Sequence, residues 1–323
     1  MHAGCHQPKP GPQGSSPWGR TGKTCLMTTT LQAAVLAEGR YFCEAPRWHD
    51  GRFWFSDFYA HEVCSVGLDG DVRVELSIDD QPSGLGWLPD GRLLVVAMIA
   101  RQVLCREHDG SVVTHADLNA VATFLANDMI VDATGQAYVG NFGFDLHGYI
   151  NEHGIEALFG ALFTDPAPFM ASLGYVTPSG EVTVAADSLL FPNGMVLLDG
   201  GSTLVVAQTL GMELTAFDRA TDGTLSNRRP WASLVFADGS MVVPDGIADD
   251  GRGGIWVANA LAPEVVRVEP SGEITHRITT SQTAFACAVG GPEGRHVLAC
   301  TAPTSDDTLA AATRNGRLEI VDF

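Results

Sequence analysis

The sequence predicts an all-β protein with the fold of a six-bladed β-propeller. A short unit, in which a turn glycine precedes an apolar strand, recurs six times along the chain. These glycines are 40, 44, 65, 51 and 43 residues apart, and one four-stranded propeller blade takes about 40–50 residues. Long helical periodicity is nearly absent, which favours the same fold class. The six turn glycines are Gly51, Gly91, Gly135, Gly200, Gly251 and Gly294.

Each unit is expected to continue into further strands joined by tight turns. The segment at residues 48–57 resembles the segment at residues 87–96, and both carry Asp-Gly before an apolar run. Further strands are expected at residues 63–68, 102–107 and 265–269, before Asp-Gly or Ser-Gly turns typical of hairpins. The strands after those turns are expected at residues 72–76, 112–115 and 273–276. A β-sandwich is the structural alternative, but it does not explain a six-fold period.

One folded domain is expected behind an N-terminal tail. Residues 1–30 are rich in Gly, Ser and Pro, lack a periodic apolar pattern and contain no apolar segment typical of a signal peptide. They are predicted to be a disordered tail, of which residues 1–26 are dispensable, and residues 31–323 to form the propeller. The longest interval between turn glycines contains an apolar insertion at residues 143–174. A lid over the site, a homodimer contact and simple loop packing are all open for this insertion.

Composition argues against several classes of partner and against disulfides. With a formal net charge of −19, the chain would repel nucleic-acid phosphates, so no nucleic acid is expected as a partner. No apolar run of about 18 residues is present to span a membrane. The seven cysteines are odd in number and show no Cys-x-x-Cys spacing. Free thiols in a reducing cytoplasm are therefore expected.

Four oxygen-bearing residues occur at one phase of the repeat, six to eight residues before a turn glycine. In a propeller this phase is expected to lie near the innermost strand, so that the four side chains point into the central channel. Carboxylates and carboxamides suit a hard cation, Ca²⁺ above all, with Mg²⁺, Mn²⁺ or Zn²⁺ as alternatives. Two carboxylates would neutralise one divalent cation. The four residues are Glu44, Asn127, Asn193 and Asp245.

Single members of this set have simpler explanations. The Pro-Asn-Gly at Asn193 and the Pro-Asp-Gly at Asp245, each taken alone, indicate only a turn. Recurrence in phase is what favours a shared metal site. Cys287 has the same phase, but the role of a small buried apolar residue is expected for it. Among the histidines, His147 and His153 in the insertion are the ones considered for a place near a site.

Four stretches of the chain, taken together and in order, resemble a known family. They are residues 44–48, 127–132, 191–195 and 244–247. They are similar to stretches of the gluconolactonase-like family, also called the senescence marker protein or regucalcin family. The resemblance implies a six-bladed propeller that holds a divalent cation in its channel and hydrolyses lactones.

The same resemblance implies a role for each in-phase residue. Glu44, Asn193 and Asp245 match the metal ligands of the family. Asn127 matches a further residue at the metal or the substrate. Asp245 also matches the proposed general base, so it is the expected catalytic residue. A metal-dependent lactonase acting on a small molecule is therefore the predicted function.

One departure from the family pattern bears on the substrate. Sugar-lactone members often carry a basic residue two positions before the asparagine that matches Asn127, whereas this chain has Leu125. Apolar residues close to the motifs are expected to bind substrate, and a sugar's hydroxyls would stay unpaired against them. We therefore expect a lactone less polar than gluconolactone. The apolar residues are Met98, Leu125, Phe142, Phe144, Phe191, Met195 and Phe285.

Two other kinds of function are compatible with these residues. A propeller can be a non-catalytic binding or scaffold protein, in which the cation is structural. The same site can also act on another ester or a phosphotriester, or open a ring without hydrolysis. Assays on matched lactone, ester and phosphotriester substrates distinguish these alternatives.

Overall fold

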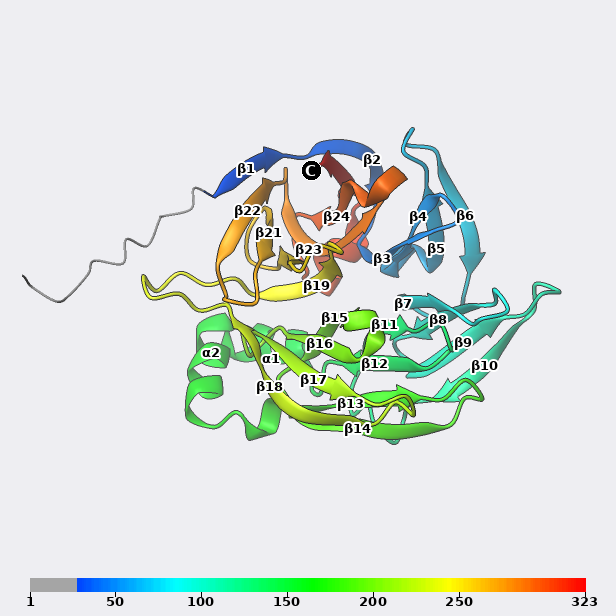
Figure 1. Ribbon diagram of the computed structural model, residues 1–323, viewed down its shortest axis with the longest axis horizontal. Coiled ribbons are helices and arrows are strands. Elements are labelled where there is room, and N and C mark those ends of the chain that lie inside the picture. Colours follow the sequence, from blue (N-terminus) through cyan, green and yellow to red (C-terminus); the bar gives the residue numbers. More distant parts are fainter. Residues whose placement is uncertain (1–27) are drawn as a thin grey trace, which may run out of the picture.

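Six sheets surround a central axis in the computed structural model, which describes residues 28–323 (Figure 1). Within each sheet four strands follow one another from the axis to the periphery, and neighbouring strands pair antiparallel. The predicted six-bladed β-propeller is confirmed. The predicted tail at residues 1–30 lies, apart from its last three residues, outside the described part of the chain.

The inner half of each blade consists of two strands. The innermost strands are β3 (Cys43–His49), β7 (Pro82–Trp87), β11 (Ala126–Val131), β15 (Pro192–Leu198), β19 (Pro244–Asp249) and β23 (Thr283–Gly290). The second strands are β4 (Arg52–Asp57), β8 (Leu93–Ala97), β12 (Ala137–Asn141), β16 (Thr203–Gln208), β20 (Ile255–Asn259) and β24 (His296–Ala302). Every residue of β8, β12, β16 and β20 is buried, because these strands pack against neighbouring blades on both faces.

The outer half of each blade also consists of two strands. The third strands are β5 (Glu62–Val66), β9 (Gln102–Arg106), β13 (Ala171–Val176), β17 (Glu213–Arg219), β21 (Glu264–Val268) and β25 (Gly316–Asp322). The outermost strands are β6 (Val72–Ser77), β10 (Val112–Asp117), β14 (Val182–Leu189), β18 (Leu225–Ser233), β22 (Ile274–Thr279) and β2 (Ala34–Arg40). The strands expected from the hairpin turns are thus present, with ends that differ by at most three residues.

Two N-terminal strands close the ring. Strand β2 pairs antiparallel with β25, so the last blade contains both ends of the domain. Strand β1 (Thr29–Gln32) pairs parallel with β22 and adds a fifth strand to the neighbouring sheet. The domain therefore begins at Thr29, two residues before the expected start at residue 31. Pairing of chain ends within one sheet removes the open edge that an unclosed propeller would expose.

The repeating glycines are visible in the sequence for a conformational reason. All six have positive φ values, between +61° and +88°. A side chain is strained in this region of backbone conformation, whereas glycine adopts it freely. Each of these turns therefore favours glycine, so a turn glycine recurs once per blade along the sequence.

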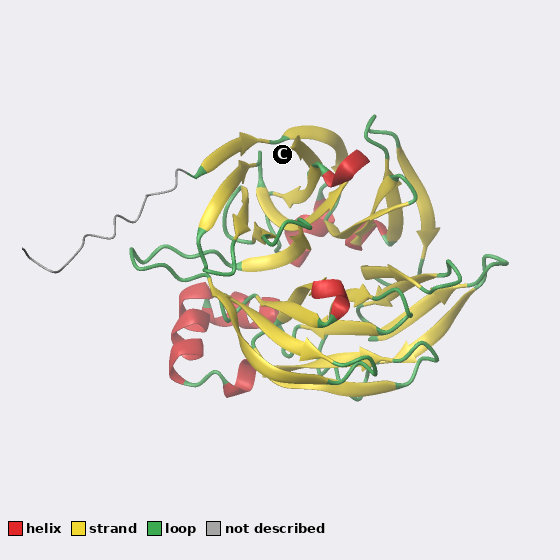
Figure 2. Cartoon of the chain, in the orientation of Figure 1, coloured by secondary structure: helices red, strands yellow, loops and turns green. Residues whose placement is uncertain are grey.

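Helices occupy the insertion between β12 and β13 (Figure 2). The insertion contains α1 (Leu146–His153), α2 (Ile155–Thr164) and the short 3₁₀ helix η2 (Ala167–Phe169). Strand β13 begins at Ala171, so the expected end of the insertion at residue 174 is too late. The remaining helices are η1 (Phe58–Ala60), η3 (Asp199–Gly201), η4 (Pro292–Gly294) and α3 (Asp307–Ala312).

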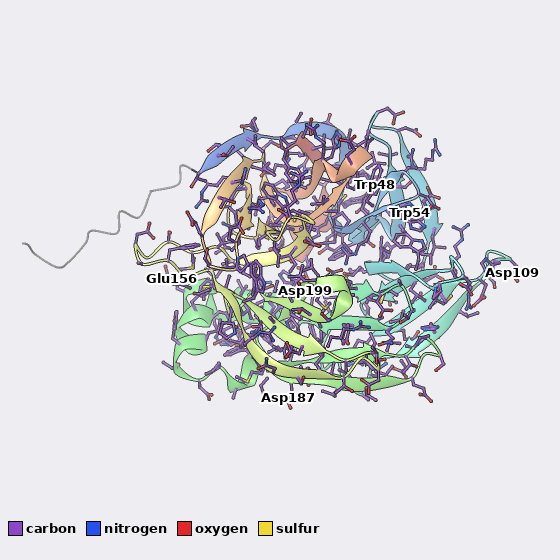
Figure 3. The ribbon with its side chains drawn as sticks, viewed as in Figure 1. Trp48, Trp54, Asp109, Glu156, Asp187 and Asp199 are labelled. Carbon is purple, nitrogen blue, oxygen red and sulfur yellow. The ribbon has the colours of Figure 1, made fainter. Side chains whose placement is uncertain are left out.

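Several acidic side chains lie on the periphery (Figure 3), and the cysteines of residues 28–323 are buried. Figure 3 shows Asp109 and Asp187 at the outer edge of the propeller and Glu156 on α2. Cys5 and Cys25 lie outside the described residues. The cysteines of residues 28–323 are buried free thiols, and free thiols were expected. None of the helices in residues 28–323 is long and apolar enough to cross a membrane. The buried free cysteines are Cys43, Cys64, Cys105, Cys287 and Cys300.

Candidate active site

A β-bulge interrupts every innermost strand at the same point. On β11, for example, Ala126 pairs with Asn141 and Met129 pairs with Val139, so two residues lie opposite one. Equivalent register shifts occur on the other five innermost strands. A bulge rotates side chains out of the regular alternation and bends the strand. The same local irregularity therefore recurs around the channel.

The four in-phase residues lie at these bulges. On three strands the in-phase residue comes directly after the last paired residue before the bulge. These residues are Asn127, Asn193 and Asp245. Glu44 differs from these three in being itself the last paired residue before the bulge, opposite Ser56. All four line one cavity of about 290 Å³. The structure therefore brings the predicted metal-binding residues together from four blades.

Hydrogen bonds join the two carboxamides. Asn127 donates from Nδ2 to Oδ1 of Asn193, over 3.1 Å. Asn193 in turn donates from Nδ2 to Oγ1 of Thr209, over 3.1 Å. Ser83 donates from its hydroxyl to Oδ1 of Asn127, also over 3.1 Å. These contacts fix both amide planes, and each Oδ1 keeps a second lone pair for a cation or a substrate.

Ser83 is a site residue that the sequence reasoning missed. It occupies the bulge of β7 at the position equivalent to Asn127 on β11, whereas counting back from Gly91 leads to its neighbour Gly84. A signal was present in the sequence, because Pro82-Ser83-Gly84 has the same form as the Pro-Asn-Gly and Pro-Asp-Gly motifs. The hydroxyl is almost fully buried, with 1% of the residue exposed, so its bond to Asn127 is shielded from water.

The two carboxylates of the cluster repel one another in a buried setting. Burial, followed by the charges of Asp245 and Asp128, raises the pKa of Glu44 well above its ordinary value. Burial and the charge of Asp128 likewise raise the pKa of Asp245, although the nearby Asn193 carboxamide opposes the rise. No arginine, lysine or histidine of residues 28–323 forms an ion pair with either carboxylate. Their charge therefore lacks a positive partner within the described chain.

This donor set fits a divalent cation. Two carboxylates match the charge of the ion, and the oxygens of Asn127 and Asn193 supply neutral ligands of the hard type. Within residues 28–323, no three His, Cys, Asp or Glu side chains gather as a metal site would require. The cluster differs from such sites because half of its donors are carboxamides. A site of this composition favours Ca²⁺, Mg²⁺ or Mn²⁺ over Zn²⁺, since Zn²⁺ prefers nitrogen and sulfur ligands.

A buried ion pair lies beside the cluster. Arg47 donates from Nη2 to Asp128 and to the carbonyl of Met129, each over 2.7 Å. Asp128 follows Asn127 in the bulge of β11, while Arg47 lines a larger cavity, of about 920 Å³. None of the four in-phase residues lines that larger cavity. The ion pair thus holds Asp128 next to the metal cluster without neutralising Glu44 and Asp245 directly.

Five of the seven predicted substrate-binding apolar residues line the cavity of the cluster. Phe144 and Met195 do not. Phe144 packs within the insertion, with its ring centroid 4.9 Å from that of Phe169, because the chain leaves the blade after Asn141. Met195 lies beyond the bulge of β15 and lines the larger cavity instead. The five that line the cavity are Met98, Leu125, Phe142, Phe191 and Phe285.

The insertion supplies part of the cavity wall. Leu146 and His147, on the first turn of α1, line the cavity. His153 does not line it; its ring packs against Tyr149, with centroids 4.6 Å apart. On α2, Leu158 and Leu162 are buried in the same apolar cluster as the phenylalanines of the cavity. The two histidines considered from the sequence therefore differ, and His147 is the one at the site.

Further lining residues were not foreseen from the sequence. They come from segments that follow the second strands or precede the innermost strands, where no repeat motif marks them. Only the folded ring brings these segments together above the cluster. They are Phe42, Phe58, Tyr59, Gln81, Ile99, Thr209, Ala260, Ser305 and Asp307.

Comparisons with known proteins find relatives in sequence and in fold. An L-arabinolactonase from Azospirillum brasilense is 29% identical over 293 residues, covering 90% of this chain and 88% of its own. A calcium-binding regucalcin from Agrobacterium tumefaciens superposes with a TM-score of 0.70 at 19% identity, over 92% of this chain and 96% of its own. A gluconolactonase from Xanthomonas campestris superposes with a TM-score of 0.66 at 22% identity, over 90% and 89%.

The family assignment rests on a match over most of the chain. The sequence profile described as the SMP-30/Gluconolactonase/LRE-like region matches residues 42–303. This range includes all four in-phase residues and every innermost strand. The chain therefore belongs to the SMP-30/gluconolactonase/LRE-like family.

Proposed function

We propose that this protein is a metal-dependent lactonase. The observation that carries the proposal is the convergence of four oxygen-bearing side chains on one cavity, where Glu44, Asn127 and Asn193 are buried and Asp245 is half-buried. The relative from Azospirillum brasilense, which is named an L-arabinolactonase, supports the reaction type. Membership of the family supports it further.

Glu44, Asn193 and Asp245 would hold the cation, with Asn127 beside it. A divalent cation held there would polarise the ester carbonyl and stabilise negative charge on its oxygen. Asp245 accepts a proton from the attacking water, because it is a carboxylate within the cluster that would hold the cation and can act there as a general base. The water oxygen bonds to the carbonyl carbon, the ring C–O bond breaks, and the ring oxygen takes up a proton. The product is the open hydroxy acid.

The walls of the cavity favour a lactone with few hydroxyl groups. Phe142 and Phe191 face one another with centroids 4.3 Å apart, and Leu125 lies where sugar-lactone members often carry a basic residue. Each buried hydroxyl without a partner costs roughly 1–3 kcal/mol. Next to these apolar side chains the hydroxyls of a polyhydroxylated ring would be unpaired, whereas an alkyl-substituted or unsubstituted ring would place no hydroxyl there.

The insertion is proposed to act as a lid over this cavity. Leu146 and His147 contribute to the wall from α1, and α2 anchors the insertion through buried Leu158 and Leu162. A segment held by its own apolar contacts can close over a substrate and exclude water from the reacting ester. The outer face of α2 leaves 78% of Phe163 exposed, and this face is where the expected homodimer contact would form.

A substrate panel tests the reaction and the metal together. Chelated protein receives Ca²⁺, Mg²⁺, Mn²⁺ or Zn²⁺, and each form is assayed on L-arabino-1,4-lactone, glucono-δ-lactone, γ-butyrolactone, γ-valerolactone and an open-chain ester. We expect activity only with metal, and a higher kcat/KM for the alkyl lactones than for the sugar lactones. Activity confined to sugar lactones would contradict the substrate proposal. Hydrolysis of a phosphotriester alone, or no turnover with any metal, would contradict the reaction.

Substitution of the base tests the mechanism. Asp245→Asn keeps the shape of the side chain but removes the proton acceptor and one of the two carboxylates that would hold the cation, so kcat at saturating metal is expected to fall by about 10²–10⁴-fold. Asp249→Asn is the matched control, because Asp249 lies on the same strand and lines the larger cavity instead. A wild-type rate in Asp245→Asn, with the protein folded and loaded with metal, would refute the role of Asp245.

A further inference from the structure

The mouth of the cavity carries a carboxylate that the proposed hydrolysis does not use. Asp307 is the first residue of α3; it is exposed and lines the same cavity as the buried Glu44 and the half-buried Asp245. Asp307 accepts hydrogen bonds from the backbone N–H of Thr308 at 2.7 Å and from the Thr308 hydroxyl at 3.3 Å. No cationic side chain of residues 28–323 pairs with it. One carboxylate oxygen therefore remains free to meet a ligand.

Aromatic rings line the cavity near this carboxylate. The ring centroid of Phe42 lies 5.4 Å from that of Phe58, 6.4 Å from that of Tyr59 and 4.8 Å from that of Phe285. All four rings line the cavity. Tyr59 and Asp307 line this cavity together, and burial, followed by the charges of Asp307 and Asp306, raises the pKa of Tyr59. Clustered aromatic faces with an adjacent carboxylate are the surroundings that weakly hydrated ammonium groups prefer.

The charge of the cavity points to the same ligand class. Of the described residues, no lysine or arginine lines it. A divalent cation at the cluster would cancel the charges of Glu44 and Asp245, and Asp307 would then leave the cavity with a negative charge. An anionic substituent on a substrate would be repelled, and a cationic one would be attracted.

We infer that the substrate is a lactone with few hydroxyls that carries a quaternary or similarly alkylated ammonium group, held between Asp307 and the aromatic rings of Phe42, Phe58 and Tyr59. The ester would then lie at Asp245 and the ammonium group at the mouth. This inference rests on the proposed lactonase function for the ester, but the ammonium site itself is a binding site that can be measured without turnover.

Binding of a cation and of its neutral isostere tests the site directly. Choline and 3,3-dimethyl-1-butanol have nearly the same shape and differ in charge. Calorimetric titration of the full chain with Ca²⁺ present is expected to show choline binding about tenfold more tightly than the alcohol. Because Asp307 is exposed, added salt should reduce this preference. Equal affinities, tighter binding of the alcohol, or no measurable choline binding would overturn the inference.

Two variants test whether the preference for choline over the alcohol arises at the mouth of the cavity. Asp307→Asn and Tyr59→Leu are each expected to remove most of the choline preference while binding of the alcohol changes less. Asp109→Asn, on an exposed hairpin turn far along another blade, is the control and is expected to bind as the wild type does. Unfolding temperatures verify that each variant is folded. A choline preference that survives in both Asp307→Asn and Tyr59→Leu would place the cation elsewhere and overturn the inference.

Rates of lactone hydrolysis test the ammonium site separately from the proposed lactonase function. The test pair is α-trimethylammonio-γ-butyrolactone and α-tert-butyl-γ-butyrolactone, with kcat/KM expected to favour the former about tenfold. Hydrolysis of both at equal rates would overturn the ammonium site and leave the lactonase proposal standing. Choline binding without hydrolysis of any lactone would support the site and refute the proposed function.

Discussion

Asn127 and Asn193 are 66 residues apart in the chain, yet the carboxamide of one donates a hydrogen bond of 3.1 Å to the oxygen of the other. Each lies at the bulge of an innermost strand, in neighbouring blades. Ser83 continues the chain of hydrogen bonds on one side and Thr209 on the other. Two of the four donors of the candidate metal site therefore belong to one hydrogen-bond network, which bears on how the site will respond to substitution.

Ser83→Ala is expected to disturb the orientation of Asn127. Loss of the hydroxyl removes a buried hydrogen bond, which costs about 1 kcal/mol of unfolding free energy. It also releases the Asn127 amide to rotate, so affinity for metal should fall by about 10-fold or more. Calcium titration followed by thermal unfolding measures both effects. Ser226→Ala, at an exposed strand position, is the control, and equal metal affinity in the two variants would contradict a positioning role for Ser83.

Metal is expected to stabilise the folded chain through the carboxylates of Glu44 and Asp245. At 100 times its dissociation constant, a bound ion adds about 2.7 kcal/mol to the unfolding free energy. Asp245→Asn should lose this gain but be as stable as wild type, or more stable, in chelator, because it removes the repulsion between Glu44 and Asp245. Thermal unfolding with and without Ca²⁺ measures the difference. An undiminished calcium shift in Asp245→Asn would show that the ion binds elsewhere.

Without metal, stability should fall as pH rises above the ordinary carboxyl range. The folded chain raises the pKa of Glu44 and of Asp245 above their ordinary values of 4.5 and 3.8. A group with a raised folded pKa adds stability below its unfolded pKa and loses that contribution as pH rises through the folded value. Unfolding temperatures in chelator, from about pH 5 to about pH 8, should therefore decline more steeply in wild type than in Asp245→Asn. Parallel profiles would contradict this electrostatic account.

Leu125→Arg should shift substrate preference toward hydroxylated lactones. The arginine would add hydrogen-bond donors beside Asn127, so the ratio of kcat/KM for L-arabino-1,4-lactone to that for γ-valerolactone should rise by about tenfold. Ile99→Arg is the matched control, because Ile99 lines the same cavity but 56% of the residue is exposed. The same rise in both variants would mean that added charge, rather than its position, sets the preference.

Arg40 is expected to be important for closure of the ring. It extends from β2 of the last blade to Asp57 of the first, with Nε–Oδ2 at 2.8 Å, and to Glu62 at 2.6 Å. Asp57 is fully buried, so Arg40→Ala leaves an unpaired charge and should cost about 3–5 kcal/mol of unfolding free energy. Denaturant unfolding measures this loss. Asp57→Asn combined with Arg40→Ala should recover part of it, and a double variant less stable than Arg40→Ala alone would contradict the explanation.

The features that could be predicted from the sequence are those in which the local backbone conformation restricts the type of residue. Turn glycines with positive φ reveal the blades, and polar residues at the bulges reveal the cluster, because both recur at fixed phase. The prediction of substrate-binding residues was wrong for two side chains that point away from the cavity of the cluster. Met195 lies beyond the bulge of β15 and points toward the other cavity. Phe144 follows the end of β12 and turns into the insertion.

By itself the sequence determined the number of blades, the four oxygen-bearing residues and the apolar character of their surroundings. Only the tertiary structure decided that Ser83 orients Asn127, that His147 rather than His153 lines the cavity, and that Asp307 lies at its mouth. The physical reason is the range of the interactions. Turns and bulges are set by neighbouring residues, whereas the cavity joins segments from several blades that meet only when the ring closes.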